Sequence, residues 1–342
     1  MAIWLFGVAA LVFAMVVVGG VTRLTGSGLS ITEWKPLLGA IPPLSDADWR
    51  AAFDQYRQIP QYELVNAGMS LNEFKGIYWW EWAHRFLGRI IGVAFAVPFL
   101  VFLVIRRMPR RLIWRCVVLL GLGGLQGLIG WWMVASGLVD RVDVAPERLA
   151  THLGLALLIF MGLIWTGLEA WNGPEPSRSP QGWARGAALL LAAIFLQCLF
   201  GGLVAGAKAG FVYTDWPLMN GQVFPPVDWG QGALAFLHDQ GLVQFVHRIW
   251  AYALLVVASL YALQAFRWRL AEGMGFWGYA LAASLWAQAA LGVVTLIHAV
   301  PLSLGALHQA GAAAVLAIGT VNLWVVLRSQ PRRFVSIRGG GL

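Results

Sequence analysis

Charged residues are scarce in this chain: only 12% of its 342 residues are Asp, Glu, Lys or Arg, whereas 59% are hydrophobic. A soluble domain carries roughly 25% charged residues, so the chain lacks the charge needed to cover a surface that faces water. This shortage excludes a soluble protein and an intrinsically disordered one. The apolar residues come in many separate blocks, which excludes a lone anchor or a cleaved signal peptide and predicts a polytopic membrane protein.

Cysteines are few, and lysine-rich tracts are absent. Cys116 and Cys198 lie in apolar surroundings without a Cys-x-x-Cys motif, so a secreted disulfide scaffold is excluded. The net charge of +8 comes from arginines in particular loops and not from a basic patch interleaved with aromatic residues. It therefore indicates membrane topology, and we expect no nucleic-acid partner.

Eight stretches are long and apolar enough to cross a membrane, which takes about 20 residues per helix. The sequence shows no strand-like alternation, so we predict an all-α polytopic membrane protein. The predicted spans are 3–22, 77–104, 113–137, 149–170, 184–206, 243–266, 274–298 and 303–327.

Arginines cluster in the loops on one side of these spans, and the opposite loops carry both signs of charge, as in Asp140-Arg141-Val142-Asp143. Because cytoplasmic loops are enriched in Lys and Arg, we expect both termini in the cytoplasm and the loop 23–76 outside. The clustered arginines are Arg106, Arg107, Arg110, Arg111, Arg115, Arg178, Arg185, Arg267, Arg269, Arg328, Arg332, Arg333 and Arg338.

The two halves of the chain resemble each other. Residues 20–43 read GVTRLTGSGLSITEWKPLLGAIPP and residues 202–226 read GLVAGAKAGFVYTDWPLMNGQVFPP, so both pass a Trp and end in Pro-Pro. Further matches are Glu81–Arg85 with Gln244–Arg248, Gln126 with Gln288, Gly130 with Gly292, and His152 with His308.

Four spans per repeat is an even number, so the two halves should share one orientation and be related by an axis along the membrane normal. We predict two four-helix bundles, formed by an N-terminal domain 1–175 and a C-terminal domain 176–342. Small-residue pairs predict close helix packing within them. These pairs are Gly88 with Gly92, Gly123 with Gly127, and Gly202 with Gly206.

Four histidines open the even-numbered spans: His84, His152, His247 and His308. With the N-terminus inside, every even span starts at the outer face, so two imidazoles per bundle should lie at one depth. A single such histidine usually bonds a neighbouring helix, but buried ionisable groups in spans are costly and often functional. Paired histidines suit the two axial positions of a heme iron. Zinc is disfavoured because no thiolate or carboxylate cluster completes a tetrahedron.

Arg85 and Arg248 each follow one of these histidines and are candidate partners for heme propionates, since guanidinium groups pair well with carboxylates. Ordinary snorkelling to the membrane boundary is the alternative. Weaker candidates for a functional role are Arg23, Arg89, His238 and His298.

The halves differ at Glu81, whose repeat partner is Gln244. Glu81 stands three residues before His84 on the same helix face. A carboxylate in one pocket and an amide in the other suggests that the first half does chemistry while the second holds an electron-transfer cofactor. The alternative is that Glu81 merely forms an ion pair with Arg85.

Motifs along nearly the whole chain resemble heme A synthase. They include GGVTRLTGSGLSITEWKPLLGAIPP, EFKGIYWWEWAHRFLGR, YTDWPLMNGQVFPP, VQFVHRIWAY and LHQAGAAAVL. The form is similar to members without paired loop cysteines, because loop 23–76 has no Cys.

The resemblance implies an oxidoreductase that converts the ring methyl of heme O to the formyl of heme A, for terminal oxidase assembly. It implies a heme B cofactor on His247 and His308, and substrate near His84, His152 and Glu81. It also implies a multi-pass protein of the bacterial inner membrane, with heme sites toward the periplasm and lipid around the spans. Heme O synthase is a candidate partner, and the glycine-rich spans permit homo-oligomers.

Two rival functions share some of these features. A diheme cytochrome that takes electrons from quinol would use all four histidines but has no use for a carboxylate in one half only. A transporter would place polar residues near the bilayer midplane, whereas only Gln126, Gln197 and Gln288 lie deep in the spans.

Overall fold

The computed structural model describes residues 1–36, 38–173, 181–267 and 272–329. Eight helices in these ranges are long and apolar enough to cross a membrane, which confirms the prediction of an all-α polytopic membrane protein. They are α1 (Ala2–Leu24), α4 (Leu71–Val104), α5 (Arg110–Ala135), α6 (Pro146–Asn172), α7 (Gln181–Gly206), α9 (Gln240–Arg267), α10 (Glu272–Ile297) and α11 (Leu302–Arg328).

Helix α4 begins six residues before the predicted span 77–104. A capping box explains the early start. The Ser70 side chain accepts from the backbone N–H of Glu73 at 3.3 Å, and the Glu73 carboxylate accepts from the Ser70 N–H at 2.7 Å. Hydropathy does not count this polar first turn, so the sequence pattern located the apolar part of the helix and missed its cap.

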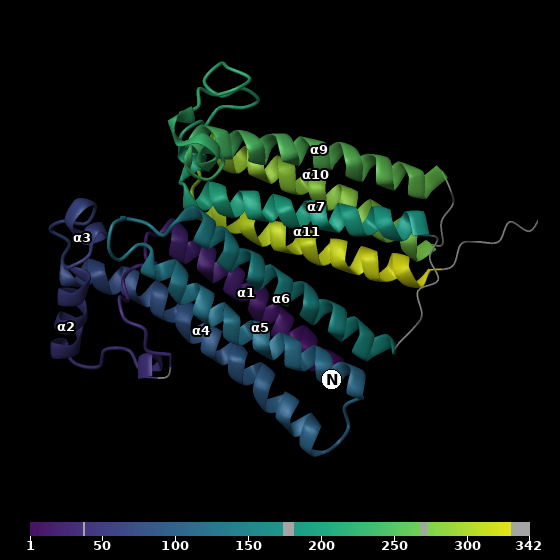
Figure 1. Ribbon diagram of the computed structural model, residues 1–342, viewed down its shortest axis with the longest axis horizontal. Helices are drawn as coiled ribbons and strands as arrows, with labels where there is room; N and C mark the ends of the chain where they lie inside the picture. The colour runs from purple at the N-terminus through teal and green to yellow at the C-terminus, as the bar shows by residue number, and fades with distance from the viewer. Residues whose placement is uncertain (37, 174–180, 268–271, 330–342) are drawn as a thin grey trace, which may run out of the picture.

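Long loops join α1 to α4 and α7 to α9, and both lie at the end of the molecule opposite the N-terminus (Figure 1). An even number of spans between them places them on one side. The sequence predicted these loops but not the short helices within them. These helices are η1 (Leu38–Ala40), α2 (Asp46–Tyr56), α3 (Pro60–Leu64), η2 (Ala209–Phe211), η3 (Trp229–Leu234) and α8 (Ala235–His238).

The spans form two groups of four: α1, α4, α5 and α6 lie together, as do α7, α9, α10 and α11 (Figure 1). This arrangement is compatible with the predicted pair of bundles, although the predicted domain boundary falls at 175–176, outside the described residues. The groups differ in one contact. Helices α9 and α10 pack closely against each other, whereas α4 and α5 touch only sparsely.

The two groups meet through α1, α6, α7 and α11, with α6 against α7 and α1 against α11. Glycines allow the close approach of α7. A Cβ at Gly206 would stand 2.6 Å from the Cα of Pro146, and one at Gly202 would stand 3.2 Å from the Cα of Ala150. The predicted packing of this small-residue pair is therefore confirmed.

The other two glycine pairs do not behave as predicted. A Cβ at Gly123 or Gly127 would meet no described atom within 4 Å, so the packing prediction for this pair is wrong within the chain. Gly88 approaches the Met15 side chain at 3.2 Å, but Gly92 also faces open space. A glycine acts as a packing site only where a neighbouring helix faces it, and at these three positions none lies within 4 Å among the described residues.

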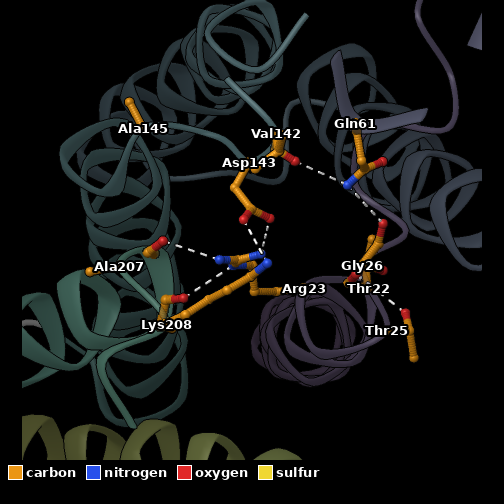
Figure 2. A network of polar contacts seen from close by, with 12 residues as sticks. Thr22, Arg23, Thr25, Gly26, Gln61, Val142, Asp143, Ala145, Ala207 and Lys208 are labelled. Atoms are coloured by element: carbon orange, nitrogen blue, oxygen red, sulfur yellow. Dashed lines mark hydrogen bonds and ion pairs between the residues drawn. The ribbon is translucent and has the colours of Figure 1, made fainter. Parts of the chain in front are cut away.

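A polar network joins the groups at the loop end (Figure 2). Arg23, at the end of α1, forms an ion pair with Asp143 at 2.8 Å and donates to the carbonyls of Ala205 and Gly206, each at 3.1 Å. Lys208 binds the other Asp143 oxygen at 2.6 Å. Arg23 thereby satisfies carbonyls left free at the end of α7 and ties α1 to the second group.

At the opposite end, arginines of α5 bind a buried carboxylate. Arg115 lies 2.9 Å from Glu169 of α6, and Arg111 forms an ion pair with the same group. These contacts link α5 to α6. Arg111 and Arg115 belong to the arginine cluster from which the membrane orientation was predicted. Other arginines of that signal lie outside the described residues: Arg178, Arg269, Arg332, Arg333 and Arg338.

Candidate functional site

The four span histidines lie near the loop-side ends of their helices. His152 and His308 each stand six residues after the first residue of α6 and α11, and His247 stands seven residues after the start of α9. His84 lies deeper in its helix, thirteen residues from the start of α4, because the capped first turns extend that helix. The structure therefore brings all four imidazoles to the same end of the bundles.

Each imidazole rests on a glycine of the preceding span. A Cβ built on the glycine would approach the ring Cε1 at 2.9 Å for Gly19 with His84, 2.9 Å for Gly130 with His152, 3.4 Å for Gly201 with His247 and 2.8 Å for Gly292 with His308. The missing side chains leave the space that the rings fill. The sequence reasoning matched Gly130 with Gly292 but did not relate either glycine to a histidine.

Three of the histidines are also held by a glutamine four residues before the glycine. The amide Nε2 of Gln126 donates to the His152 carbonyl at 3.0 Å and lies 3.2 Å from its ring Nδ1. Gln197 Nε2 lies 3.1 Å from the His247 carbonyl and 3.1 Å from its Nδ1. Gln288 Nε2 lies 2.7 Å from the His308 carbonyl and 3.0 Å from its Nδ1. A Gln-x-x-x-Gly spacing on one helix thus positions a histidine on the next.

His84 lacks this partner. Four residues before Gly19 the chain has Met15, whose side chain lies against the Gly88 position of α4. Among the described residues, His84 Nδ1 is buried and has no hydrogen-bond partner. The first span therefore follows the spacing of the others with a thioether in place of the amide.

Glu81 lies beside His84 on α4, and its side chain is only 3% exposed. Its Oε2 accepts from Ser30 Oγ and from the Ile31 N–H, both at 2.7 Å, and its Oε1 accepts from Arg85 at 2.5 Å. The ion pair considered from the sequence does form, but as part of a larger buried network. A carboxylate offers about four acceptor positions, so three donors leave one free.

Arg85 extends this network to the loop after α1. Its guanidinium donates to the carbonyls of Glu33 at 2.9 Å and Ile31 at 2.6 Å. Arg89, one turn later, donates to the carbonyls of Lys35 at 2.9 Å and Pro36 at 2.8 Å. The two arginines hold the loop against α4, and residue identity carries no signal for backbone partners of this kind.

The second half uses the same device without a carboxylate. Gln244 donates to the Tyr213 carbonyl at 3.0 Å, and Arg248 donates to Tyr213 and Leu218, both at 3.0 Å. Both halves thus clamp a loop onto the helix that carries a histidine. The first clamp contains a buried carboxylate on the histidine helix, whereas the carboxylate within electrostatic range of Arg248 is Asp215 of the loop.

The two weaker histidine candidates lie apart from these pairs. His238 of α8 lies 3.3 Å from Glu147 of α6. His298 is exposed, with its Nδ1 2.8 Å from the Val294 carbonyl. The hydrogen bonds and ion pairs of these two histidines do not involve the span histidines. Arg23, the other weaker candidate, binds Asp143 between the two bundles.

The donor sets fit a pair of axial ligands better than a metal cluster. In the described ranges, no three His, Cys, Asp or Glu side chains gather as a metal site. Instead, His84 lies within electrostatic range of His152, and His247 within that of His308. The carbonyl oxygens of Gln126 and Gln197 are buried without partners. The glutamine atom that faces the ring Nδ1 is the amide nitrogen in both cases, so these carbonyl oxygens do not accept from the ring in this arrangement.

Comparison with known proteins agrees with this arrangement. The model of the family COX15-CtaA, described as cytochrome oxidase assembly protein, matches residues 2–320. The chain belongs to the COX15-CtaA family. The match includes all eight spans except the end of the last helix, so both histidine pairs lie within the region that defines the family.

Members of the COX15-CtaA family from several bacteria resemble the chain over almost its full length. A protein of Caulobacter vibrioides named heme A synthase is 60% identical over 329 residues, which cover 96% of each chain. Heme A synthase of Parvibaculum lavamentivorans is 53% identical over 330 residues, covering 95% of this chain and 93% of the relative. The resemblance noted in the motifs is therefore confirmed.

Proposed function

We propose that this protein is a heme A synthase, an oxidoreductase that converts the ring methyl of heme O to the formyl group of heme A. The observation that carries the proposal is the asymmetry between two otherwise matched pockets: both have paired histidines, and only the first has a buried carboxylate. The full-length similarity to relatives named heme A synthase supports it.

We assign the substrate pocket to the first bundle. His84 and His152 would face the iron of heme O, and Glu81 would lie beside the reacting edge of the ring. Conversion of a methyl to an aldehyde removes four electrons and proceeds through two hydroxylations and loss of water. Each oxidation develops positive charge or releases a proton at the reacting carbon. The remaining acceptor position of Glu81 suits either role.

We assign a heme B cofactor to the second bundle, on His247 and His308. A heme with two histidine ligands supplies electron transfer, because it has no open iron position for another ligand. Gln197 and Gln288 fix the two rings through the carbonyl and ring contacts described above. Arg85 and Arg248 lie at the loop side of the pockets, where the propionates of a heme would meet water, and each already binds loop carbonyls. Each arginine would thus bind a propionate and also hold the loop through its hydrogen bonds to the loop carbonyls.

We place the protein in the bacterial inner membrane with both termini cytoplasmic and the histidines toward the periplasm. Arg110, Arg111 and Arg115, in the first turns of α5, support this orientation because arginines are enriched on the cytoplasmic side. Lipid would surround the spans. Heme O synthase as a donor of substrate and a homo-oligomeric state are further proposals that the glycine-rich spans permit.

A diheme cytochrome remains the second candidate, since the glycine seats are alike in both halves. The first experiment is expression in a host that makes heme O but no heme A, with extracted hemes identified by mass. Heme A that appears only with this protein supports the proposal. Heme B alone with heme O untouched, in membranes where the protein is inserted and an electron acceptor is present, would contradict it and favour the cytochrome.

A further inference from the structure

Two glycines of α4 and two of α5 border an open space next to the first histidine pair, on the side away from the loops. A Cβ built at Gly92, Gly123 or Gly127 would have no described atom within 4 Å. At Gly88 it would meet only the end of the Met15 side chain, at 3.2 Å. The space bordered by these four glycines, the glycine gap, lies where α4 and α5 touch only sparsely.

The glycine gap opens on the faces that α4 and α5 turn toward the bundle core. On α4, successive spacings of seven, four and three residues from Glu81 to Phe95 place both glycines on one face with these two residues. Glu81 and Phe95 are buried, whereas the glycines between them are exposed. On α5, Leu119 is buried four residues before the exposed Gly123. Exposure on an inward face between buried neighbours shows that the chain does not fill the bundle there.

The glycine gap is continuous with the first histidine pair. Gly88 follows His84 by one turn of α4, and Gly127 precedes Gly130, the seat of His152, by three residues of α5. The Nδ1 of His84 is buried without a hydrogen-bond partner among the described residues. Both helices thus lead from a histidine ring into the open space, so a ligand held between the two rings can extend into it.

The glycine gap is short, and side chains close both of its ends. Toward the loops, Trp34 lies in the loop that Arg89 holds to α4, and it packs on Trp131 of α5 with ring centroids 5.3 Å apart. Away from the loops, Phe95 and Leu119 belong to the hydrophobic core. The α4 histidine and Phe95 are eleven residues apart, which is about 16 Å along a helix. A spanning helix of a second copy would need a longer groove, whereas a short chain attached to a heme fits this length.

The second bundle fills the matching positions. Extending the repeat alignment along the helices pairs Gly92 with Leu255 of α9 and Gly123 with Leu285 of α10. Both leucines are buried in the hydrophobic core, and α9 packs closely against α10. The other two glycines correspond to Ala251 and Ala289. The open space is therefore a property of the pocket assigned to the substrate and not of the pocket assigned to heme B.

The two hemes differ in a substituent that bears on this space, because heme O carries an isoprenoid chain where heme B carries a vinyl group. Such a chain is apolar and gains free energy when it leaves water or fills an empty apolar space. We propose that the glycine gap binds the isoprenoid chain of the substrate heme and makes the first bundle select heme O over heme B. The identity of this heme as the substrate rests on the proposed function.

The test is heme binding to the full-length protein purified with heme B in its second bundle. The first pocket is titrated in detergent with heme O and, separately, with heme B, and absorbance gives both dissociation constants. The wild type should bind heme O more tightly than heme B. Gly123→Leu introduces the residue that α10 has at the matching position. It should weaken heme O binding at least about tenfold, since burial of two methylene groups corresponds to that factor, and leave heme B binding unchanged.

Gly121→Leu is the matched control. Gly121 also lies on α5 with no described atom within 4 Å of its Cβ position, but it stands two residues from Gly123 and therefore on the opposite face. This variant should leave both dissociation constants unchanged, and Gly123→Ala should weaken heme O binding less than Gly123→Leu does. The retained heme B spectrum of the second bundle reports that each variant is folded.

Three results would overturn the proposal. They are an unchanged heme O constant in Gly123→Leu, an equal loss of affinity for both hemes, and an equal loss in Gly121→Leu. If Gly123→Leu loses a bound phospholipid or a dimer while heme O binding stays unchanged, the occupant is a lipid chain or a second copy and not the substrate.

The titration requires no turnover, so its outcome is separate from that of the expression test. Heme O selectivity that Gly123→Leu abolishes, in a protein that makes no heme A, would keep the isoprenoid site and refute the synthase. Heme A production with a heme O constant that ignores Gly123→Leu would keep the synthase and refute the isoprenoid site.

Discussion

The two bundles share one construction and differ at two positions, one on the helix that carries His84 and one on the helix before it. Both seat their histidines on glycines and clamp a loop with an arginine. The first bundle has Glu81 where the second has Gln244, and Met15 where the second has Gln197. The first bundle thus has a buried carboxylate three residues before His84 and no hydrogen-bond partner for His84 Nδ1 among the described residues, whereas the second has an amide at each matching position. Duplicated sites diverge here through the neighbours of a ligand and not through the ligand itself.

The largest expected difference between the bundles comes from replacing one of the paired histidines in one bundle only. His247→Ala or His308→Ala should abolish the low-spin heme B spectrum of the purified protein, because a two-histidine site cannot keep its spectrum with one ligand. His84→Ala should leave that spectrum in place. The absorbance of the reduced protein, normalised to protein mass, measures the loss.

The exposed His298 provides the matched control, since it follows the last residue of α10 and its Nδ1 lies beside the Val294 carbonyl. If His84→Ala and not His247→Ala abolishes the spectrum, the cofactor lies in the first bundle and our assignment of the pockets is reversed.

Replacing Glu81 by Gln makes the first clamp resemble the second. The amide can still accept from Ser30 and Ile31, so we expect the loop and the heme B spectrum to survive, whereas heme A production should fall by about 100-fold or more through loss of the charge. Heme A extracted from a heme O-producing host gives the measure. Glu63→Gln, an exposed carboxylate in the same loop, is the control. Substantial heme A from the Glu81 variant would refute its catalytic role.

The junction between bundles should show a smaller effect that depends on burial. The Arg23 side chain is 14% exposed and holds Asp143 and two carbonyls, whereas Lys208 is 49% exposed and holds Asp143 alone. Arg23→Ala should therefore lower the free energy of unfolding by about 1–3 kcal/mol, and Lys208→Ala by less than about 1 kcal/mol.

Thermal unfolding of both variants in one detergent checks this order, with the exposed Arg57→Ala as a reference for a surface ion pair. Equal melting temperatures for Arg23→Ala and Lys208→Ala would show that the contacts of Arg23 with the two carbonyls add nothing to the junction.

The smallest effect concerns the loop ends, where each half again uses a carboxylate. Hydrogen bonds from Ser45 lower the pKa of Asp48, and a bond from the Asn220 N–H lowers the pKa of Asp215. A carboxylate whose pKa is lower in the folded state than in the unfolded state stabilises the folded loop at pH values above the unfolded pKa of roughly 3.9. This stabilisation is lost as the pH falls through the folded pKa.

The protection factors of the α2 amides, which are exchange rates corrected for the intrinsic pH dependence of amide exchange, should therefore fall on acidification below about pH 4. Asp48→Asn should remove most of this pH dependence while the loop at Asp215 keeps its own. Protection of α2 that is the same at pH 6 and pH 3 in the wild type would contradict the role of this cap.

Hydropathy and the repeat were sufficient to predict the eight spans and the four histidines, because both depend on patterns within single helices. The supports of the histidines were not predictable in the same way. Gln126 and Gln288 match across the repeat, but Gln197 has Met15 as its partner. The glutamine pattern is therefore interrupted at Met15, the position that precedes His84. Partners that are backbone carbonyls, as for Arg85 and Arg248, leave no trace in residue identity.

The glycine seats affect how natural variants of such a protein should be interpreted. A single methyl group at Gly19, Gly130 or Gly292 would stand under 3 Å from an imidazole carbon, whereas at Gly201 the same group would be in ordinary contact at 3.4 Å. Gly-to-Ala changes are usually scored as mild. At three positions here they displace a ring, and at the fourth the site has room, so the same substitution has unequal consequences.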